Sequence, residues 1–383
     1  MTRDTASLLN DLDRGLSLPA SWYTDPTILA REQEHIFRRT WQYLGRAELL
    51  ADVGNYLTGV AGDVPIVVVR GDDGLKAFVN VCRHRRHEVM AGAGRCKVLQ
   101  CPYHAWTYDL DGRLKAAPRA EREKDFRKEE LSLLPVRVET WGPWVFVNPD
   151  VQARPLAYYL GELPQVIAVS GVDLAQLKFQ ERVAWEGKAN WKVMIENYLE
   201  CYHCPVQHPG FSAVINVDPD AYRLKSYEWF SSQTGPVRPS ALAGQGRKAA
   251  YDAGGAVTQA QYHFLWPNFT VNINPGHQNL SLDVWLPDGL DRTCGYSEYY
   301  FGPDAPAEWT RELIAFSRQV GEEDDRLTAS VQRGLRGGLP ARGRFLLNSE
   351  HLVIHFQRLV VEALCCGQRN PATAERAGTA LPG

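Results

Sequence analysis

The sequence predicts an α+β protein with two domains: a small all-β domain, then a larger one that combines a curved antiparallel sheet with long helices. Two observations predict this architecture. Short β-branched runs separated by tight turns continue to about residue 150. Beyond it, alternating strand patterns give way to stretches with apolar residues three and four positions apart. We place an N-terminal helical segment at 1–39, the all-β domain at 40–150, the second domain at 151–366 and a flexible tail at 367–383.

The strands of the first domain are predicted by residue type and by turn chemistry. Residues 65–69 form a β-branched run, and the Gly-Asp-Asp-Gly segment at 71–74 is a hairpin signal. Strands over 75–81 and 98–100 follow, and each leads into a cysteine.

The second domain is predicted from two kinds of periodicity. Apolar residues recur at helical spacing over 193–204, and Pro205 is expected to end that helix. The other elements are four strands and two long helices. We place these strands at 262–265, 269–273, 280–286 and 293–301, and the helices at 307–335 and 351–364.

Composition excludes several classes of partner. The net charge of −3 provides no basic field for nucleic acid or for an anionic membrane. No apolar run approaches the roughly 18 residues that a membrane-spanning helix needs. The first residues include acids and have no apolar core, unlike a signal peptide, so we expect a cytoplasmic protein. The eight cysteines do not indicate a disulfide framework, and those without a ligand role are expected to be buried thiols.

The first chemical motif combines two cysteines with two histidines. Cys82 and His84 form a Cys-x-His pair, and Cys101 and His104 form a Cys-x2-His pair after sixteen intervening residues. Because each pair follows a predicted strand, each can lie on a loop at the tip of a hairpin. Two thiolates on one iron and two neutral imidazoles on the other give a [2Fe-2S] cluster of raised potential.

Zinc is the alternative for this motif, because two cysteines and two histidines also suit a tetrahedral zinc site. Zinc motifs, however, usually pair Cys with Cys and His with His, whereas one Cys and one His on each loop are typical of a Rieske cluster. His87 is a further imidazole nearby, and we interpret it as a surface residue or a neighbour of the cluster.

The second chemical motif is Glu200-x2-His203-x4-His208. Two histidines on either side of Pro205 cannot share one continuous helix face, so the helix must end for His208 to fold back to the same metal. Two histidines and one carboxylate form the facial triad of ferrous enzymes that activate dioxygen. We therefore expect His203 and His208 to bind Fe(II). Packing in the core is the alternative for a single histidine.

Both motifs resemble those of the Rieske non-haem iron oxygenases, also called ring-hydroxylating oxygenases. The similar segments are 82–85, 101–108, 111–112 and 196–205, and the resemblance extends over about residues 20–364. The Ser-Trp-Tyr-Thr-Asp-Pro segment at 21–26 is similar to the branch that includes choline monooxygenase and glycine-betaine demethylases. One difference is Arg86, where the family often has a glycine that would ease a tight loop.

The resemblance implies roles for two acidic residues. In this family, the acid three residues before the first histidine connects that histidine to a cluster histidine of the neighbouring subunit, which assigns an electron-transfer bridge to Glu200. A helix face shared by Glu200 and His203 would support this role. The third iron ligand of the family lies in a late acidic segment. Asp324 matches its position, and Asp325 is the alternative.

The resemblance also implies an architecture, partners and a reaction. A Rieske β-domain and a helix-grip catalytic domain are expected in a homotrimer, where the cluster of one subunit serves the iron of the next. Since no glycine-rich nucleotide loop is visible, a separate NAD(P)H-dependent reductase, with or without a ferredoxin, would supply electrons. The expected reaction is O2 activation at Fe(II) and hydroxylation of a small organic substrate, by monooxygenation or oxidative demethylation of an amine or betaine.

Other functions remain open at this point. An aromatic substrate would be mono- or dihydroxylated instead, while a Rieske electron-transfer protein or a non-catalytic subunit would not be an enzyme. The substrate pocket is expected between the sheet of residues 262–301 and the helix around 196–203. Aromatic residues could line it, cage a quaternary ammonium group or form ordinary core. They are Tyr262, Phe264, Trp266, Phe269 and Trp285.

Overall fold

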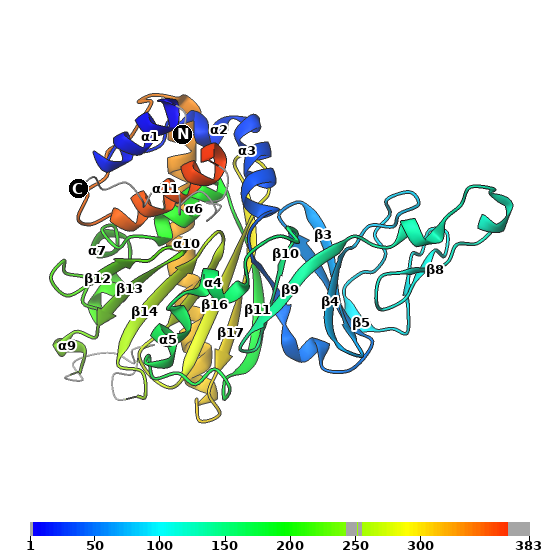
Figure 1. The fold of residues 1–383 in the computed structure, drawn as a ribbon. Helices are drawn as coiled ribbons and strands as arrows, with labels where there is room; N and C mark the ends of the chain where they lie inside the picture. Colours follow the sequence, from blue (N-terminus) through cyan, green and yellow to red (C-terminus); the bar gives the residue numbers. More distant parts are fainter. Residues whose placement is uncertain (1–2, 243–250, 252–254, 367–383) are drawn as a thin grey trace, which may run out of the picture. The chain divides into compact units, whose positions relative to one another are not determined.

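A computed structural model describes residues 3–242, 251 and 255–366 (Figure 1). The chain divides into two compact units, one of residues 37–159 and the other of the residues before and after them. The tail expected at 367–383 lies outside the described residues. In the part of the chain that is described, no helix is both long enough and apolar enough to cross a membrane.

Residues 37–159 form an all-β unit with two antiparallel sheets. The larger sheet has seven strands in the order β1-β10-β9-β4-β3-β2-β5, and the smaller has the order β6-β7-β8. The strands are β1 (Gln42–Arg46), β2 (Asn55–Ala61), β3 (Val64–Gly71), β4 (Gly74–Val79), β5 (Ala93–Arg95), β6 (Leu99–Gln100), β7 (Thr107–Tyr108), β8 (Leu114–Ala116), β9 (Pro135–Trp141) and β10 (Trp144–Asn148). Short helical turns lie at Ala47–Leu50, Ala120–Arg122 and Lys128–Leu131.

Strand β3 separates two apolar clusters in this unit, because successive strand residues point to opposite faces. Ile66 and Val68 pack on one side of it, and Val67 and Val69 pack on the other. The second of these clusters also contains the two cysteines of the Cys/His pairs. The bases of both cysteine-bearing loops are therefore held by the core.

The other unit contains a seven-stranded antiparallel sheet in the order β11-β17-β16-β15-β14-β13-β12. Its strands are β11 (Lys178–Gly187), β12 (Arg223–Ser226), β13 (Phe230–Pro236), β14 (Gln259–Leu265), β15 (Phe269–Ile273), β16 (Asn279–Pro287) and β17 (Thr293–Phe301). The sheet curves, and the long helix α10 runs behind it in Figure 1. Helix α6 contacts both α10 and β16, which places its last turn beside the sheet.

The helices are concentrated in this larger unit. They are α1 (Arg3–Asp13), α2 (Ser21–Thr24), α3 (Pro26–Glu32), α5 (Leu163–Ala168), α6 (Trp191–Tyr198), α7 (Cys204–Gln207), α8 (Pro209–Val214), α9 (Pro239–Leu242), α10 (Ala307–Gly337) and α11 (His351–Cys366). A helical turn at Gln33–Phe37 and the helix α4 (Leu156–Leu160) lie at the two sequence boundaries between the units.

The predicted α+β fold with its curved antiparallel sheet is confirmed, and so are the four strands and two long helices of the second domain. The predicted helix over 193–204 is wrong in extent. Helix α6 ends at Tyr198, and a separate turn, α7, begins at Cys204. Pro205 stands in the first turn of α7, where the missing backbone N–H of proline costs no hydrogen bond, so this proline starts a helix instead of ending one.

A buried ion pair ties the N-terminal segment to α6. The Nζ of Lys192 lies 2.5 Å from Oε1 of Glu32, and both side chains are excluded from solvent. The indole nitrogen of Trp191 donates to the other oxygen of Glu32 at 2.8 Å. Buried charges are tolerated when they are paired and hydrogen-bonded, as they are here. Asn190 caps the same helix by accepting a bond from the backbone N–H of Lys192.

Candidate metal centres and substrate cavity

The two loops that carry the Cys/His pairs have the same backbone pattern. The N–H of Arg86 donates to the carbonyl of Cys82 at 3.0 Å, and the N–H of Ala105 donates to the carbonyl of Cys101 at 3.0 Å. Arg86 and Ala105 thus occupy equivalent positions, four residues after a cysteine. Both have left-handed backbone, with φ of 59° and 56°. The glycine that the family often has in place of Arg86 would adopt this conformation with less strain.

The four side chains of this motif are arranged with sulfur inside and nitrogen outside. Cys82 and Cys101 are each only 2% exposed, and both are free thiols. His84 and His104 are exposed, and their ring centroids are 4.6 Å apart. This donor set fits a [2Fe-2S] cluster with two thiolates on a buried iron and two imidazoles on an outer one.

Two aromatic residues support these loops. The hydroxyl of Tyr108 accepts a bond from the backbone N–H of Arg83 at 3.0 Å and lies 3.4 Å from the sulfur of Cys82. The indole of Trp106 stacks on the imidazole of His84, with centroids 4.9 Å apart and 7° between the planes. These contacts orient one cysteine and one histidine of the motif.

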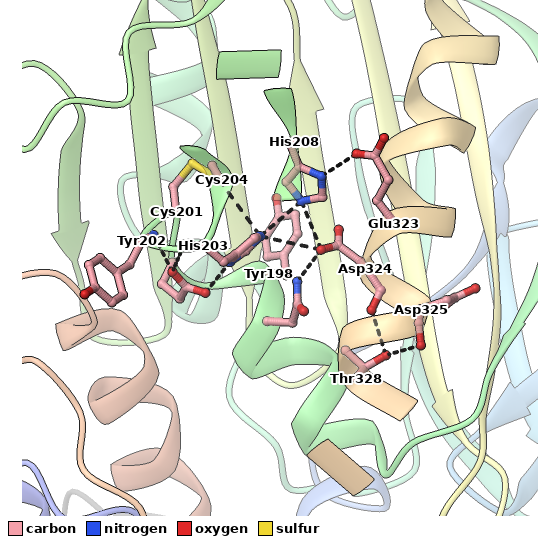
Figure 2. A network of polar contacts seen from close by, with 12 residues as sticks. Tyr198, Cys201, Tyr202, His203, Cys204, His208, Glu323, Asp324, Asp325 and Thr328 are labelled. Atoms are coloured by element: carbon pink, nitrogen blue, oxygen red, sulfur yellow. Dashed lines mark hydrogen bonds and ion pairs between the residues drawn. A yellow bond between two sulfur atoms is a disulfide. The ribbon is translucent and has the colours of Figure 1, made fainter. Parts of the chain in front are cut away.

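In the larger unit, His203, His208 and Asp324 lie together (Figure 2), and their ligand atoms are all within 4.8 Å of one another. The two Nε2 atoms are 3.1 Å apart. The Oδ1 of Asp324 lies 3.5 Å from Nε2 of His203 and 3.1 Å from Nε2 of His208. Metal bonds of roughly 2.1 Å at right angles separate neighbouring ligand atoms by about 3 Å, so the spacing fits a facial triad around one divalent iron.

Each histidine of this group has a carboxylate on its other ring nitrogen. Glu200 contacts Nδ1 of His203 through Oε1, and Oε2 of Glu323 lies 2.7 Å from Nδ1 of His208. A carboxylate accepts the proton of Nδ1–H, which leaves Nε2 of each neutral ring free for a metal. Glu323 was not identified from the sequence. The only signal was its place in an acidic run on α10, which alone resembles a solvated face.

The carboxylates make the field at this centre strongly negative. Burial opposes ionisation of Asp324, but hydrogen bonds from both histidines outweigh it and lower the pKa of this carboxyl to about 2. Burial also opposes a charge on His203, but Asp324 and Glu200 outweigh it and raise the pKa of the imidazole to about 9. The same field favours a divalent cation between the rings.

Asp324 and Asp325 are separated by the helix geometry. Successive residues of α10 point about 100° apart, and of these two carboxylates it is Asp324 that contacts both imidazoles. The amide of Asn197 donates to Oδ1 of Asp324 at 2.8 Å and holds that carboxylate beside the rings. Among the described residues, the group of possible metal ligands contains Asp324 and does not contain Asp325.

The helix face expected to be shared by Glu200 and His203 is not present. Helix α6 has already ended at Tyr198, and both residues lie in the turn that follows. In this turn, Oε2 of Glu200 accepts the backbone N–H groups of Tyr202 and of His203, the latter at 3.3 Å. The Glu200 carboxylate therefore holds the turn as well as the ring.

Cys201 and Cys204 correct the expectation of buried thiols, because they form a disulfide in this turn. The two cysteines stand on either side of His203 in the sequence, and Sγ of Cys204 lies 4.0 Å from Nε2 of that histidine. Their spacing in the sequence was visible, but their pairing depends on the turn that replaces the predicted helix.

A cavity of about 360 Å³ adjoins the histidines and is bounded by α6, α10 and the curved sheet. Of the aromatic walls expected from the sequence, Tyr262 and Trp285 line it. The alternative of ordinary core is confirmed for Phe264, Trp266 and Phe269, which are buried and do not line the cavity, and the first two pack against Phe356 of α11. Aromatic residues that the sequence reasoning missed also line the cavity: Trp185, Tyr198, Phe211, Tyr222, Tyr251 and Tyr299.

Comparison with known protein families agrees with both centres. Residues 40–141 match the Rieske [2Fe-2S] domain, and residues 174–365 match the catalytic domain of the ring hydroxylating alpha subunit. The chain belongs to the Rieske-type ring-hydroxylating oxygenases. This Rieske oxygenase is therefore an oxidoreductase, and its cofactors are a [2Fe-2S] cluster and a mononuclear iron that reacts with O2. The predicted family, enzyme class and cofactors are confirmed.

Individual relatives of this Rieske oxygenase cover nearly its whole length. The carnitine monooxygenase oxygenase subunit of Acinetobacter pittii (strain PHEA-2) is 33% identical over 362 residues, which are 91% of this chain and 95% of that protein. The chloroplastic choline monooxygenase of Beta vulgaris is 33% identical over 358 residues, which are 91% of this chain and 77% of that protein.

Solved structures give the same result for the fold. A quaternary ammonium Rieske monooxygenase in complex with L-carnitine is 31% identical, with a TM-score of 0.79 over 93% of this chain and 98% of that one. The naphthalene 1,2-dioxygenase of Rhodococcus sp. is only 20% identical and shares the fold, with a TM-score of 0.77 over 95% of this chain and 98% of that one.

Proposed function

We propose that this chain is the terminal oxygenase component of a system that hydroxylates a quaternary ammonium compound at a carbon attached to nitrogen. The observation that carries the proposal is the group of His203, His208 and Asp324 beside a cavity with aromatic walls. Three of the four relatives named above support the substrate class: a carnitine monooxygenase subunit, a choline monooxygenase and a quaternary ammonium monooxygenase. The naphthalene 1,2-dioxygenase, at 20% identity, shows only the fold.

The proposed roles of the site residues follow from their geometry. The cluster is held by Cys82, His84, Cys101 and His104, in a domain that we place at residues 40–150. The iron is held by His203, His208 and Asp324, in a domain that we place at residues 151–366. The bound iron supplies the position at which O2 is activated with electrons from a cluster.

The surrounding residues prepare the site for this reaction. Glu200 and Glu323 hold the two rings with Nε2 toward the iron position, and Asn197 orients Asp324. One oxygen atom enters a C–H bond, and the other leaves as water with two electrons and two protons. When the hydroxylated carbon carries nitrogen, the C–N bond then breaks and yields an amine and an aldehyde.

The electron path is proposed to require other chains. A separate NAD(P)H-dependent reductase supplies the electrons, and Glu200 connects His203 to a cluster histidine of a neighbouring subunit in a homotrimer. The contact between Glu200 and His203 supports this role. A related quaternary ammonium Rieske monooxygenase is described in terms of inter-subunit electron transfer.

Substrate-stimulated oxygen uptake tests the proposed function. The purified oxygenase is supplied with NADH and a surrogate reductase, and then with choline, glycine betaine, L-carnitine, methoxy-aromatics or aromatic acids. We expect a quaternary ammonium compound to stimulate uptake and to yield oxidised product in proportion to O2 consumed. Stimulation by aromatic compounds alone would overturn the substrate class.

Metal analysis provides the matching control for the two centres. About three iron atoms for two sulfide ions per chain are expected, because the mononuclear iron adds to the two irons of the cluster. The Asp324→Ala variant should fall to about two iron atoms and keep its sulfide, whereas Asp325→Ala should keep all three. The opposite result would assign the third ligand to Asp325.

A further inference from the structure

Asp283 of β16 is a carboxylate in the cavity wall that is surrounded by neutral donors. The hydroxyl of Thr270 and the amide of Asn272 donate to its Oδ2 at 2.9 and 2.8 Å, and the hydroxyl of Ser297 donates to its Oδ1 at 2.5 Å. Thr270 and Ser297 stand directly opposite Asp283 on the two neighbouring strands. Three adjacent strands thus form a polar patch in the wall of the cavity, beside some of its aromatic residues.

This carboxylate forms no ion pair in the part of the chain that the structure describes. Asp283 is partly buried, and Arg318, which lines the same cavity, forms no ion pair with it. Burial raises the pKa of Asp283, although Ser297, Asn272 and Thr270 act in the opposite direction. The amide nitrogen of Asn272 can only donate, so it favours an ionised Oδ2. A partly buried carboxylate without an ion pair is stabilised when a cation joins it.

The rings beside Asp283 are suited to a cation. Trp285 lies two residues along the same strand and therefore points to the same face of the sheet. Its ring centroid is 4.8 Å from that of Trp185 and 6.2 Å from that of Tyr198, and all three residues line the cavity. Trp185 has room because Gly295 lies next to it, where a Cβ would approach the indole to 2.4 Å.

The polar patch is linked to the iron site by two consecutive residues at the end of α6. Asn197 donates to Asp324, as described above, and the hydroxyl of Tyr198 donates to Oδ1 of Asn272 at 2.7 Å. This bond fixes the orientation of the Asn272 amide, so its NH2 group points to Asp283. A ligand held at Asp283 therefore shares one cavity with the atoms that face the iron position.

We propose that Asp283 is a specificity-determining residue that attracts the cationic head of the substrate, with Trp185, Trp285 and Tyr198 as the wall around it. The inference rests on the proposed function. Three of the roughly four acceptor positions of this carboxylate are already occupied by Thr270, Asn272 and Ser297. A partner that needs no hydrogen bond is therefore favoured, which selects a quaternary over a primary ammonium group.

Binding of isosteric ligands tests this role. The holoenzyme is titrated without O2 or reductant with choline and with 3,3-dimethylbutan-1-ol, in which carbon replaces the charged nitrogen. We expect the wild-type protein to bind choline at least about tenfold more tightly than 3,3-dimethylbutan-1-ol. The same preference is expected for glycine betaine over 3,3-dimethylbutanoate, in which carbon again replaces the charged nitrogen. Equal binding of ion and neutral isostere by the wild-type protein would overturn the proposal without any variant.

The Asp283→Asn variant tests the residue itself. The new amide can still accept from Thr270 and Asn272 and can donate to Ser297, so it removes the charge with little change in shape. We expect its affinity for the cation to fall at least about tenfold and that for the neutral isostere to change less than about twofold. The control is Asp288→Asn, in the turn after the same strand, where Asp288 pairs with Arg292. Equal losses of affinity for the cation and for the neutral isostere would show a structural role of Asp283 and contradict the proposal.

Turnover separates this inference from the proposed function. If cations bind through Asp283 and none is oxidised, the role of Asp283 is supported and the proposed reaction is contradicted. If Asp283→Asn oxidises a quaternary ammonium compound with unchanged kcat/KM, the proposed reaction is supported and the role of Asp283 is contradicted. A primary amine that binds as well as its trimethylated counterpart would contradict the selection of a quaternary group.

Discussion

Glu323 accepts a hydrogen bond from His208, with 2.7 Å between Oε2 and Nδ1. The next residue of α10, Asp324, approaches the opposite nitrogen of the same ring, with 3.1 Å between Oδ1 and Nε2 (Figure 2). Two consecutive residues of one helix thus contact both nitrogens of one imidazole. One sets the tautomer and orientation of the ring, and the other lies where the iron is proposed to bind.

Removal of the Glu323 carboxylate is expected to weaken iron binding. In Glu323→Ala, His208 loses the group that orients its ring, and iron affinity should fall about 10–100-fold. Glu323→Gln should lose less, because its amide oxygen can still accept from Nδ1–H. Iron retained after dialysis against a chelator measures the effect. Glu312→Ala, about three turns earlier on α10, is the control, and equal retention in both alanine variants would contradict the role of Glu323.

Replacement of Glu200 is expected to separate metal binding from turnover. In Glu200→Gln, an amide oxygen can still accept from Nδ1 of His203, so the cluster and the iron should both remain. The charge that is proposed to link the two centres is lost, and coupled turnover should be lost with it. Iron and sulfide content and the ratio of product to O2 consumed measure the two effects. Unimpaired turnover would refute the bridge.

Substitution of Arg86 by glycine is expected to relieve backbone strain. The left-handed φ of Arg86 costs a residue with a Cβ about 1 kcal/mol more than it costs glycine. Glycine would remove this cost, but its greater freedom in the unfolded chain offsets part of the stabilisation. Arg86→Gly should therefore retain the cluster and stabilise its loop by about 0.5 kcal/mol. Thermal loss of the visible absorbance of the cluster reports the change. Arg85→Gly is the control and should destabilise the cluster loop. If both variants lost the cluster absorbance at a similarly lowered temperature, strain at Arg86 would be contradicted.

Glu196 is expected to make stability depend on pH. Its carboxyl accepts bonds from Tyr23 and Gln357 at 2.6 and 2.8 Å, yet burial outweighs them and raises its pKa from 4.5 to about 7. Between these values the folded protein keeps the proton while the unfolded chain loses it. The free energy of unfolding therefore falls as pH rises through this window, by up to about 3 kcal/mol, and this loss is complete above pH 7.

The Glu196→Gln variant measures this contribution. Its amide oxygen can accept the same two bonds and is neutral at every pH, so the fall in unfolding free energy between pH 5 and pH 8 should become smaller by up to about 3 kcal/mol. Denaturant unfolding at several pH values provides the measurement. Glu181→Gln, at an exposed position of β11, should leave the pH profile unchanged. A profile for Glu196→Gln that coincides with that of the wild-type protein would exclude Glu196 as its source.

The sequence by itself determined the features whose information is local. The Cys/His pairs are set by spacing within two short loops, and each pair directly follows a strand that residue type and turn chemistry predict. The strands β14–β17 and the helices α10 and α11 follow from periods of 2 and 3.6 residues, which need no knowledge of partners.

The tertiary structure alone decided the features that depend on residues far apart in the chain. His208 and Asp324 are 116 positions apart, and only the packing of α10 beside the end of α6 brings Asp324 to the histidines and turns Asp325 away. The end of α6 at Tyr198 and the disulfide that follows were hidden for the same reason, because the local pattern also suits a longer helix. The role proposed for Asp283 was hidden as well, because sequence spacing shows neither the cavity nor the three donors on neighbouring strands that surround this carboxylate.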